Sequence, residues 1–182
     1  MKEIKYADFE LAEFKDRVRR LRVEMEKSGL DALIVSNPAS MRYIFGFHNQ
    51  LQVSASRAFV GIFVREDHDK SVLFIPHDCQ DAPQTWVEDV RFWDEGLDPP
   101  FDDLTVDISK VVTAIEKRGL KRSRIGIELG DGMSLGMPVW QFDRMRSLLS
   151  EATLIDLSPI IWALRLIKSP AEIEVLRKAN SI

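Results

Sequence analysis

Amphipathic helix patterns alternate with short apolar runs of strand length along most of this chain, and that alternation limits the folds it can adopt. The first pattern has apolar residues three and four positions apart from Leu11 to Met25, and Gly29 is placed to end that helix. A buried strand is expected over residues 30–35. The polar face of the opening helix is expected to carry Glu13, Asp16, Arg17, Arg20 and Glu24.

Two β-rich runs in the middle of the chain predict a hairpin. Residues 57–64 and 71–75 are apolar and rich in β-branched and aromatic side chains, and the polar segment 65–70 separates them. An antiparallel hairpin inside an otherwise parallel arrangement makes the sheet mixed. The fold class expected is therefore α/β, in three layers, with a mixed sheet flanked by helices.

The second half of the chain continues the alternation. Asp102 or Asp103 is expected to cap a helix that Gly119 ends. The other elements expected are a short helical turn at 81–87, strands at 90–93, 124–129 and 153–157, and a helix at 138–149.

The last segment has the strongest helix-start signal. Ser169 to Glu172 supply a serine cap, a proline at the first helical position and a glutamate three residues after the cap. The helical spacing then continues to Ile182 without a stop signal. We therefore expect this chain to be one domain of a longer protein, cut within a helix that leads to the next domain.

Length and composition exclude several classes of protein. The 182 residues suit one sizeable domain, and a net charge of −4 with interspersed charges provides no basic stripe for nucleic acid. No stretch approaches the roughly 18 apolar residues of a membrane span, and the first residues do not resemble a secretory signal. Cys79 is the single cysteine, so no intrachain disulfide can form and a cytoplasmic location is expected.

Four segments carry a resemblance to a known family: residues 29–35, 41–46, 125–129 and 164–173. Together they resemble the N-terminal domain of the creatinase/prolidase family, the Xaa-Pro dipeptidase and aminopeptidase type of metallopeptidase. In the closing segment, Arg165, Lys168, Ser169, Glu172 and Ile173 match the R-x-x-K-[ST]-x-x-E-[IL] run that begins the linker helix of that family. The resemblance implies an N-terminal domain over 1–164 and the start of the linker at 165–182.

The resemblance implies a two-part enzyme. The catalytic, pita-bread domain would follow residue 182 and hold two ions of manganese, cobalt or zinc through two aspartates, one histidine and two glutamates. This chain alone would then bind no metal, have no catalytic residue and be inactive. In that family the N-terminal domain caps the active site of the partner subunit, so the resemblance also implies a cytoplasmic homodimer that acts on a peptide or small carboxylate substrate.

Two other functions fit the same resemblance. One is the N-terminal domain of a creatinase-like amidinohydrolase, for which a carboxylate-binding arginine matters more. The other is a catalytically inactive homologue that binds a peptide or protein. Metal ligands beyond residue 182 would favour an enzyme, because fold alone does not decide activity.

Three residues are candidates for substrate binding. Creatinase-type relatives place an arginine shortly after the tyrosine and glycine motif to bind a substrate carboxylate, and Arg57 takes that role by resemblance. The alternative is a solvated charge at the start of a strand. Histidine can bind a charged group through either ring nitrogen, so His48 is expected to orient a substrate terminus; the alternative is an ordinary surface histidine. Phe47 lies in the same loop.

Two apparent motifs are rejected. His77, Asp78 and Cys79 combine metal-ligand types, but one cysteine and three scattered histidines do not make a zinc site, and Cys79 has no predicted base to activate it. The segment 130–136 lies between a strand and a helix but lacks the spacing and the lysine of a phosphate loop, so a plain turn is expected.

Overall fold

The computed structural model describes residues 1, 8–49, 59–79, 84–93 and 106–181. Six strands form one sheet in the order β4-β3-β2-β1-β5-β6. The strands are β1 (Ala32–Val35), β2 (Val60–Val64), β3 (Val72–Pro76), β4 (Asp89–Trp93), β5 (Arg124–Ile127) and β6 (Thr153–Asp156).

The sheet is mixed, as predicted. β2 pairs antiparallel with both β1 and β3, which confirms the expected hairpin, and the other pairs are parallel. The four central strands have buried residues on both faces, whereas the edge strands β4 and β6 are partly exposed.

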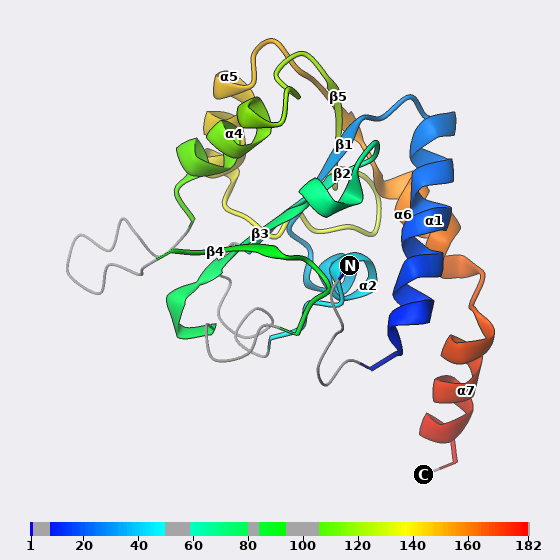
Figure 1. Ribbon diagram of the computed structural model, residues 1–182. Coiled ribbons are helices and arrows are strands. Elements are labelled where there is room, and N and C mark those ends of the chain that lie inside the picture. The colour runs from blue at the N-terminus through cyan, green and yellow to red at the C-terminus, as the bar shows by residue number, and fades with distance from the viewer. Residues whose placement is uncertain (2–7, 50–58, 80–83, 94–105, 182) are drawn as a thin grey trace.

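Helices cover both faces of the sheet in three layers (Figure 1). One face packs its core under α1, α2 and α6, and the other under α4 and α5. The α-helices of the described chain are α1 (Leu11–Lys27), α2 (Pro38–Phe45), α4 (Ile108–Lys117), α5 (Val139–Leu148), α6 (Ser158–Leu166) and α7 (Pro170–Ala179); the 3₁₀ turns are η1 (His68–Lys70) and η2 (His77–Cys79). The predicted α/β/α class is confirmed.

Several helix boundaries follow the predicted signals. Gly29 adopts φ 63° just after α1, and Gly119 adopts φ 74° just after α4. Both are conformations that favour glycine over residues with a Cβ atom. The capping box before α7 forms between Ser169 and Glu172, and α7 ends at Ala179 with Asn180 as its cap.

Three local predictions are wrong. The cap of α4 is Asp107, whose carboxylate accepts from the Ser109 amide, and not Asp102 or Asp103, which lie outside the described residues. Residues 84–87 of the predicted turn are not helical, and residues 81–83 lie outside the described residues; Thr85 and Trp86 donate side-chain hydrogen bonds to carbonyls at the end of α2. β5 stops at Ile127, two residues early, since Glu128 turns toward the start of α2.

Two helices lie where no helix was predicted. α2 and α6 are eight and nine residues long, and each has a proline in its first turn. Polar side chains are few in both helices, Ser40 and Arg42 in α2 and Ser158 and Arg165 in α6, so neither shows the polar stripe on which helix prediction relies. Both helices contribute to the surface described next.

Candidate functional site

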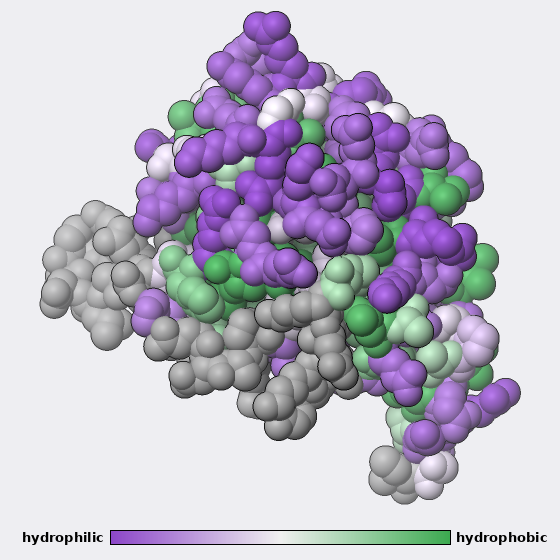
Figure 2. All heavy atoms as spheres, in the orientation of Figure 1, coloured by the Kyte–Doolittle hydropathy of each residue, from purple (hydrophilic) through white to green (hydrophobic). Residues whose placement is uncertain are grey.

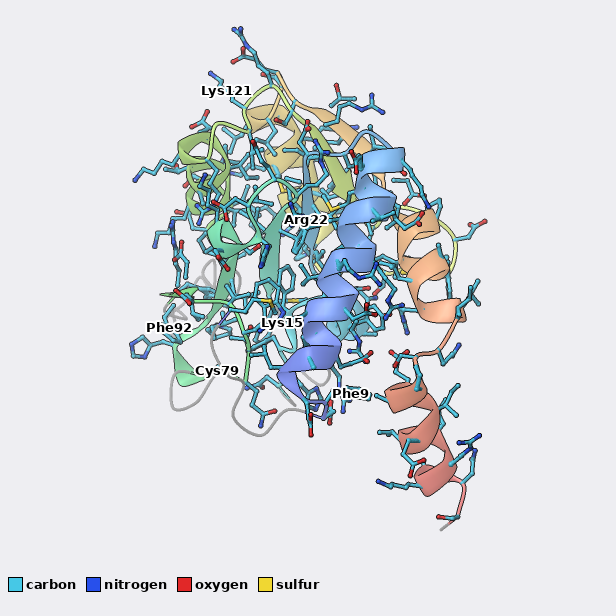
Figure 3. The ribbon with its side chains drawn as sticks, turned by 45° about the vertical axis from the view of Figure 1, so that its right-hand side comes forward. Phe9, Lys15, Arg22, Cys79, Phe92 and Lys121 are labelled. Carbon is cyan, nitrogen blue, oxygen red and sulfur yellow. The ribbon has the colours of Figure 1, made fainter. Side chains whose placement is uncertain are left out.

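A cavity of about 540 Å³ opens between α1, α2 and the start of α7. A second hollow of about 310 Å³ adjoins it between α6 and α7, and both are lined by Phe9, Tyr43, Arg165 and Glu172. Figure 3 shows Phe9 at the start of α1, on the side of the molecule where α7 begins. The residues that the sequence singled out in its tyrosine motif and closing segment therefore meet at one surface.

The start of α2 is fixed by two side chains. The Asn37 side-chain oxygen caps the helix by accepting from the Ala39 and Ser40 amides. Glu128 reaches from the end of β5 to accept from the Ser36 and Asn37 amides at 3.1 and 2.9 Å. Glu128 is 2% exposed, and this burial raises the pKa of its carboxyl while the two amide bonds offset part of the rise.

Arg17 is the most connected side chain of the site and is 3% exposed. Its Nε donates to Glu13 at 3.0 Å and its Nη2 to Glu172 at 2.9 Å, while Nη1 lies 3.4 Å from the Tyr43 carbonyl oxygen. The guanidinium carbon lies 4.4 Å from the centroids of both the Phe9 and Tyr43 rings. Such contacts allow a permanently charged group to be buried.

The burial of Arg17 corrects the prediction that it lies on the polar face of its helix. Arg17 is three residues after Phe14 and four before Leu21, so it falls on the buried stripe of α1. Because Arg17 is charged, it does not count as one of the apolar positions, although its spacing from Phe14 and Leu21 is that of the buried stripe.

Tyr43 joins α2 to the end of α6. Its hydroxyl donates to the Leu164 carbonyl at 3.0 Å, and its residue is 8% exposed. Burial raises the pKa of the Tyr43 phenol above its ordinary value of 10.0. The phenol is therefore a neutral donor at physiological pH, and its role here is to hold α6 against α2.

Charged groups lie at the outer rim of the cavity. Arg42 pairs with Asp8 at 2.6 Å, and the hydrogen bond from Arg42 lowers the pKa of the Asp8 carboxyl. His48 is exposed in the same lining. Half-buried Arg165 lies 5.8 Å from the centroid of the Trp162 ring, and no ion pair joins it to a carboxylate among the residues described. Its guanidinium has the geometry to bind a carboxylate or another planar anion.

The remaining residues of the closing segment shape the start of α7. Ser169 and Glu172 exchange the two bonds of the capping box, Ser169 N to Glu172 Oε2 at 2.8 Å and Glu172 N to Ser169 Oγ at 3.1 Å. Exposed Lys168 donates to the Leu166 carbonyl, and Ile173 is 38% exposed. Figure 2 shows hydrophobic side chains among the hydrophilic ones over the side of the molecule formed by α6 and α7.

Two of the three predicted substrate-binding residues, His48 and Phe47, lie in the described part of the chain. Arg57 lies outside the described residues. His48 lines the cavity, whereas Phe47 is 1% exposed with its ring centroid 5.8 Å from that of Phe59. Phe47 thus anchors the end of α2 in the core, and the substrate roles of all three residues stay predictions.

The other motifs lie elsewhere. Cys79 is buried within η2, and Asn49 Nδ2 lies 3.1 Å from its sulfur. In the part of the chain that the structure describes, no three histidine, cysteine, aspartate or glutamate side chains are grouped closely enough to hold a metal ion. Residues 130–136 lead from β5 to α5, and the amide of Gly130 donates to the Ser158 hydroxyl.

Comparison with known proteins agrees with this architecture. The family model for the creatinase/prolidase N-terminal domain matches residues 17–167. A curated relative, an uncharacterized hydrolase/peptidase of Sinorhizobium fredii, is 29% identical over 96% of this chain and 43% of its own length. The chain thus spans less than half of that relative.

Solved structures show the same fold. A prolidase from Thermococcus sibiricus superposes with a TM-score of 0.67 and 22% identity over 91% of this chain and 40% of its own. The Xaa-Pro dipeptidase from Bacillus anthracis has a TM-score of 0.64 and 20% identity over 91% and 39%. The N-terminal domain of the cytoplasmic peptidase PepQ from Mycobacterium tuberculosis has a TM-score of 0.57 and 18% identity over 82% and 98%.

Proposed function

The chain belongs to the creatinase/prolidase N-terminal domain family, and from this premise we propose that it is the non-catalytic N-terminal domain of an Xaa-Pro dipeptidase or aminopeptidase. The observation that carries the proposal is the family match over residues 17–167, joined by 29% identity to a hydrolase/peptidase over nearly the whole chain. The peptidase description of that relative favours peptide hydrolysis over the amidinohydrolase and binding-protein alternatives.

Catalysis in the proposed enzyme belongs to residues outside this chain. In line with the family resemblance, we assign the ions of manganese, cobalt or zinc to the following domain. When bound, a pair of such ions supplies an activated water and polarises the scissile carbonyl. This chain would contribute shape and charge around the substrate.

The rim of the cavity supports a capping role. Arg42 within α2 and His48 beyond its end present polar groups at the rim, and Arg165 offers a guanidinium with no carboxylate bound to it among the described residues. A free substrate carboxylate is the group that such a rim would attract. We propose that this end of the domain faces the active site of a partner subunit, with Arg57 binding the substrate carboxylate.

The proposed assembly is a cytoplasmic homodimer. PepQ, one of the proteins of the same fold, is described as a cytoplasmic peptidase, which supports the location by analogy. No helix in the described ranges combines the length and the apolar character of a membrane span. Size-exclusion chromatography with light scattering on the longer gene product tests the dimer directly.

Metal analysis tests the assignment of the metal ions to the following domain. The 182-residue chain and the longer gene product are each loaded with manganese, desalted and measured by mass spectrometry. The proposal predicts two ions per longer chain and none retained by the 182-residue chain. Two tightly held ions in the short chain, or none in the longer protein, would overturn it.

A further inference from the structure

α7 is joined to the rest of the domain at one end. None of its residues is buried, and Figure 1 shows it projecting beyond the other helices. Within the described ranges, the ion pair from Arg17 to Glu172 is the one side-chain hydrogen bond or ion pair that links α7 to another element. The direction of α7 therefore depends strongly on this contact.

Arg17 is held in place without α7. Its Nε is fixed by Glu13, Nη1 points to the Tyr43 carbonyl, and its plane packs on the rings of Phe9 and Tyr43. The guanidinium is a rigid planar fork, so two fixed donors also fix the third. Nη2 consequently presents a donor whose position is set by α1 and α2.

Glu172 is held just as firmly on its own side. Its Oε2 accepts from the Ser169 amide in the capping box, which sets the side chain relative to the first turn of α7. Its Oε1 is then free to meet Arg17, at 2.9 Å. Two groups, each fixed within its own element, meet in a single charge-assisted hydrogen bond.

We propose that Arg17 is a positioning residue that sets the direction in which α7 leaves the domain. The pair Arg17–Glu172 links side chains 155 positions apart and joins the first helix of the domain to the helix that leads out of it. One consequence rests on the proposed function. In the whole enzyme, this pair would set the orientation of the catalytic domain relative to the capping surface.

The test measures the direction of α7 in the 182-residue chain. Nitroxide labels are attached at Lys15→Cys on α1 and Arg177→Cys on α7, both exposed positions, in a Cys79→Ser background. Figure 3 labels Lys15 beside α1, away from α7, and its side chain is exposed. Double electron–electron resonance then reports the distribution of distances between the two helices.

Glu172→Gln is the informative variant. A glutamine keeps an oxygen for the Ser169 amide and so preserves the cap, but it removes the ion pair, and Arg17 keeps Glu13 as its counter-charge. Glu174→Gln is the matched control, because Glu174 carries the same charge on the same helix and pairs only with Lys178 among the described residues.

The proposal predicts one narrow distance distribution in the parent and in Glu174→Gln, and a shifted or broader one in Glu172→Gln. Hydrogen exchange of the α7 amides should be about tenfold faster in Glu172→Gln, since a ten-residue helix is marginal when undocked and the lost bond involves charged groups. Arg17→Met should repeat the broadening. A Glu172→Gln distribution identical to the parent would overturn the proposal.

A second measurement separates this inference from the proposed function. In the longer gene product, Glu172→Gln should lower kcat for an Xaa-Pro dipeptide with metal content unchanged, whereas Glu174→Gln should not. An inactive parent protein would refute the proposed function and leave the resonance result standing. An active parent with unaltered kcat in Glu172→Gln would refute the domain-orienting consequence.

Discussion

Glu128 links the sheet to the candidate site, and its removal should have a large and specific effect on stability. Its carboxylate is the acceptor for the Ser36 and Asn37 amides at the start of α2. In Glu128→Ala both amides lose that acceptor in a largely buried setting. At about 1–3 kcal/mol for each such group, we expect a loss of about 3 kcal/mol in the free energy of unfolding. For a chain of this size, the Tm should fall by roughly 6–12 °C.

Glu128→Gln separates the hydrogen bonds from the charge. The amide oxygen of glutamine still accepts from both backbone groups, so the variant should lose less than about 1 kcal/mol at neutral pH. Because burial holds the folded-state pKa of Glu128 above its ordinary value of 4.5, its contribution to stability is fully present below that value. The contribution is lost as the pH rises through the folded-state pKa.

Urea unfolding followed by tryptophan fluorescence between pH 4.5 and 8 checks this reasoning. The free energy of unfolding of the parent minus that of Glu128→Gln should decrease as the pH rises. Glu151→Gln is the control: hydrogen bonds from Lys121 and Arg122 lower the pKa of Glu151, so its difference should stay flat over this range. A flat difference for Glu128→Gln, or one that increases with pH, would refute the account of Glu128.

Three further predictions concern substrate binding, backbone geometry and capping. In the longer gene product, Arg57→Ala should raise KM or lower kcat/KM for substrates with a free carboxylate, while the Tm stays within about 1 °C. Unchanged kinetics would mean that Arg57 is a solvated charge without a role in substrate binding. Gly136→Ala should lower the unfolding free energy by about 2–3 kcal/mol, because φ is 66° and a Cβ atom would overlap the Ser36 carbonyl oxygen. Gly119→Ala, at φ 74° with open space around the Cβ position, should lower it by only about 1 kcal/mol. Equal losses in the two variants would contradict this prediction. Ser169→Ala should reduce the helicity of α7 in NMR chemical shifts and destabilise that helix by about 1 kcal/mol, and unchanged shifts would exclude a role for the capping box.

The layers of the fold could be predicted because most helices have one polar face and the strands are short apolar runs. The sequences of α1, α4 and α7 have apolar residues at helical spacing and residues that mark a helix end, so these helices could be predicted from local rules. α2 and α6 could not be found in this way, since their sequences contain few polar residues and α6 has apolar Trp162 and Leu166 on its exposed side. Their prolines mark where they begin, but proline alone also marks a turn.

The candidate site was harder to predict than the fold. Its central contact joins Arg17 to Glu172, and no spacing rule connects side chains at opposite ends of a chain. Arg17 was assigned to the polar face because it is charged, although two carboxylates and a set of aromatic rings make its burial favourable. Glu128 was seen only as part of a family motif, and its role depends on where β5 ends beside α2.

Hydrolysis of an Xaa-Pro dipeptide tests the central claim most directly. Equal molar amounts of the 182-residue chain and of the longer gene product are assayed with manganese supplied to both. The account predicts release of proline by the longer protein and none by the 182-residue chain. Hydrolysis by the short chain would contradict it, and so would a metal-loaded longer protein that leaves the dipeptide intact.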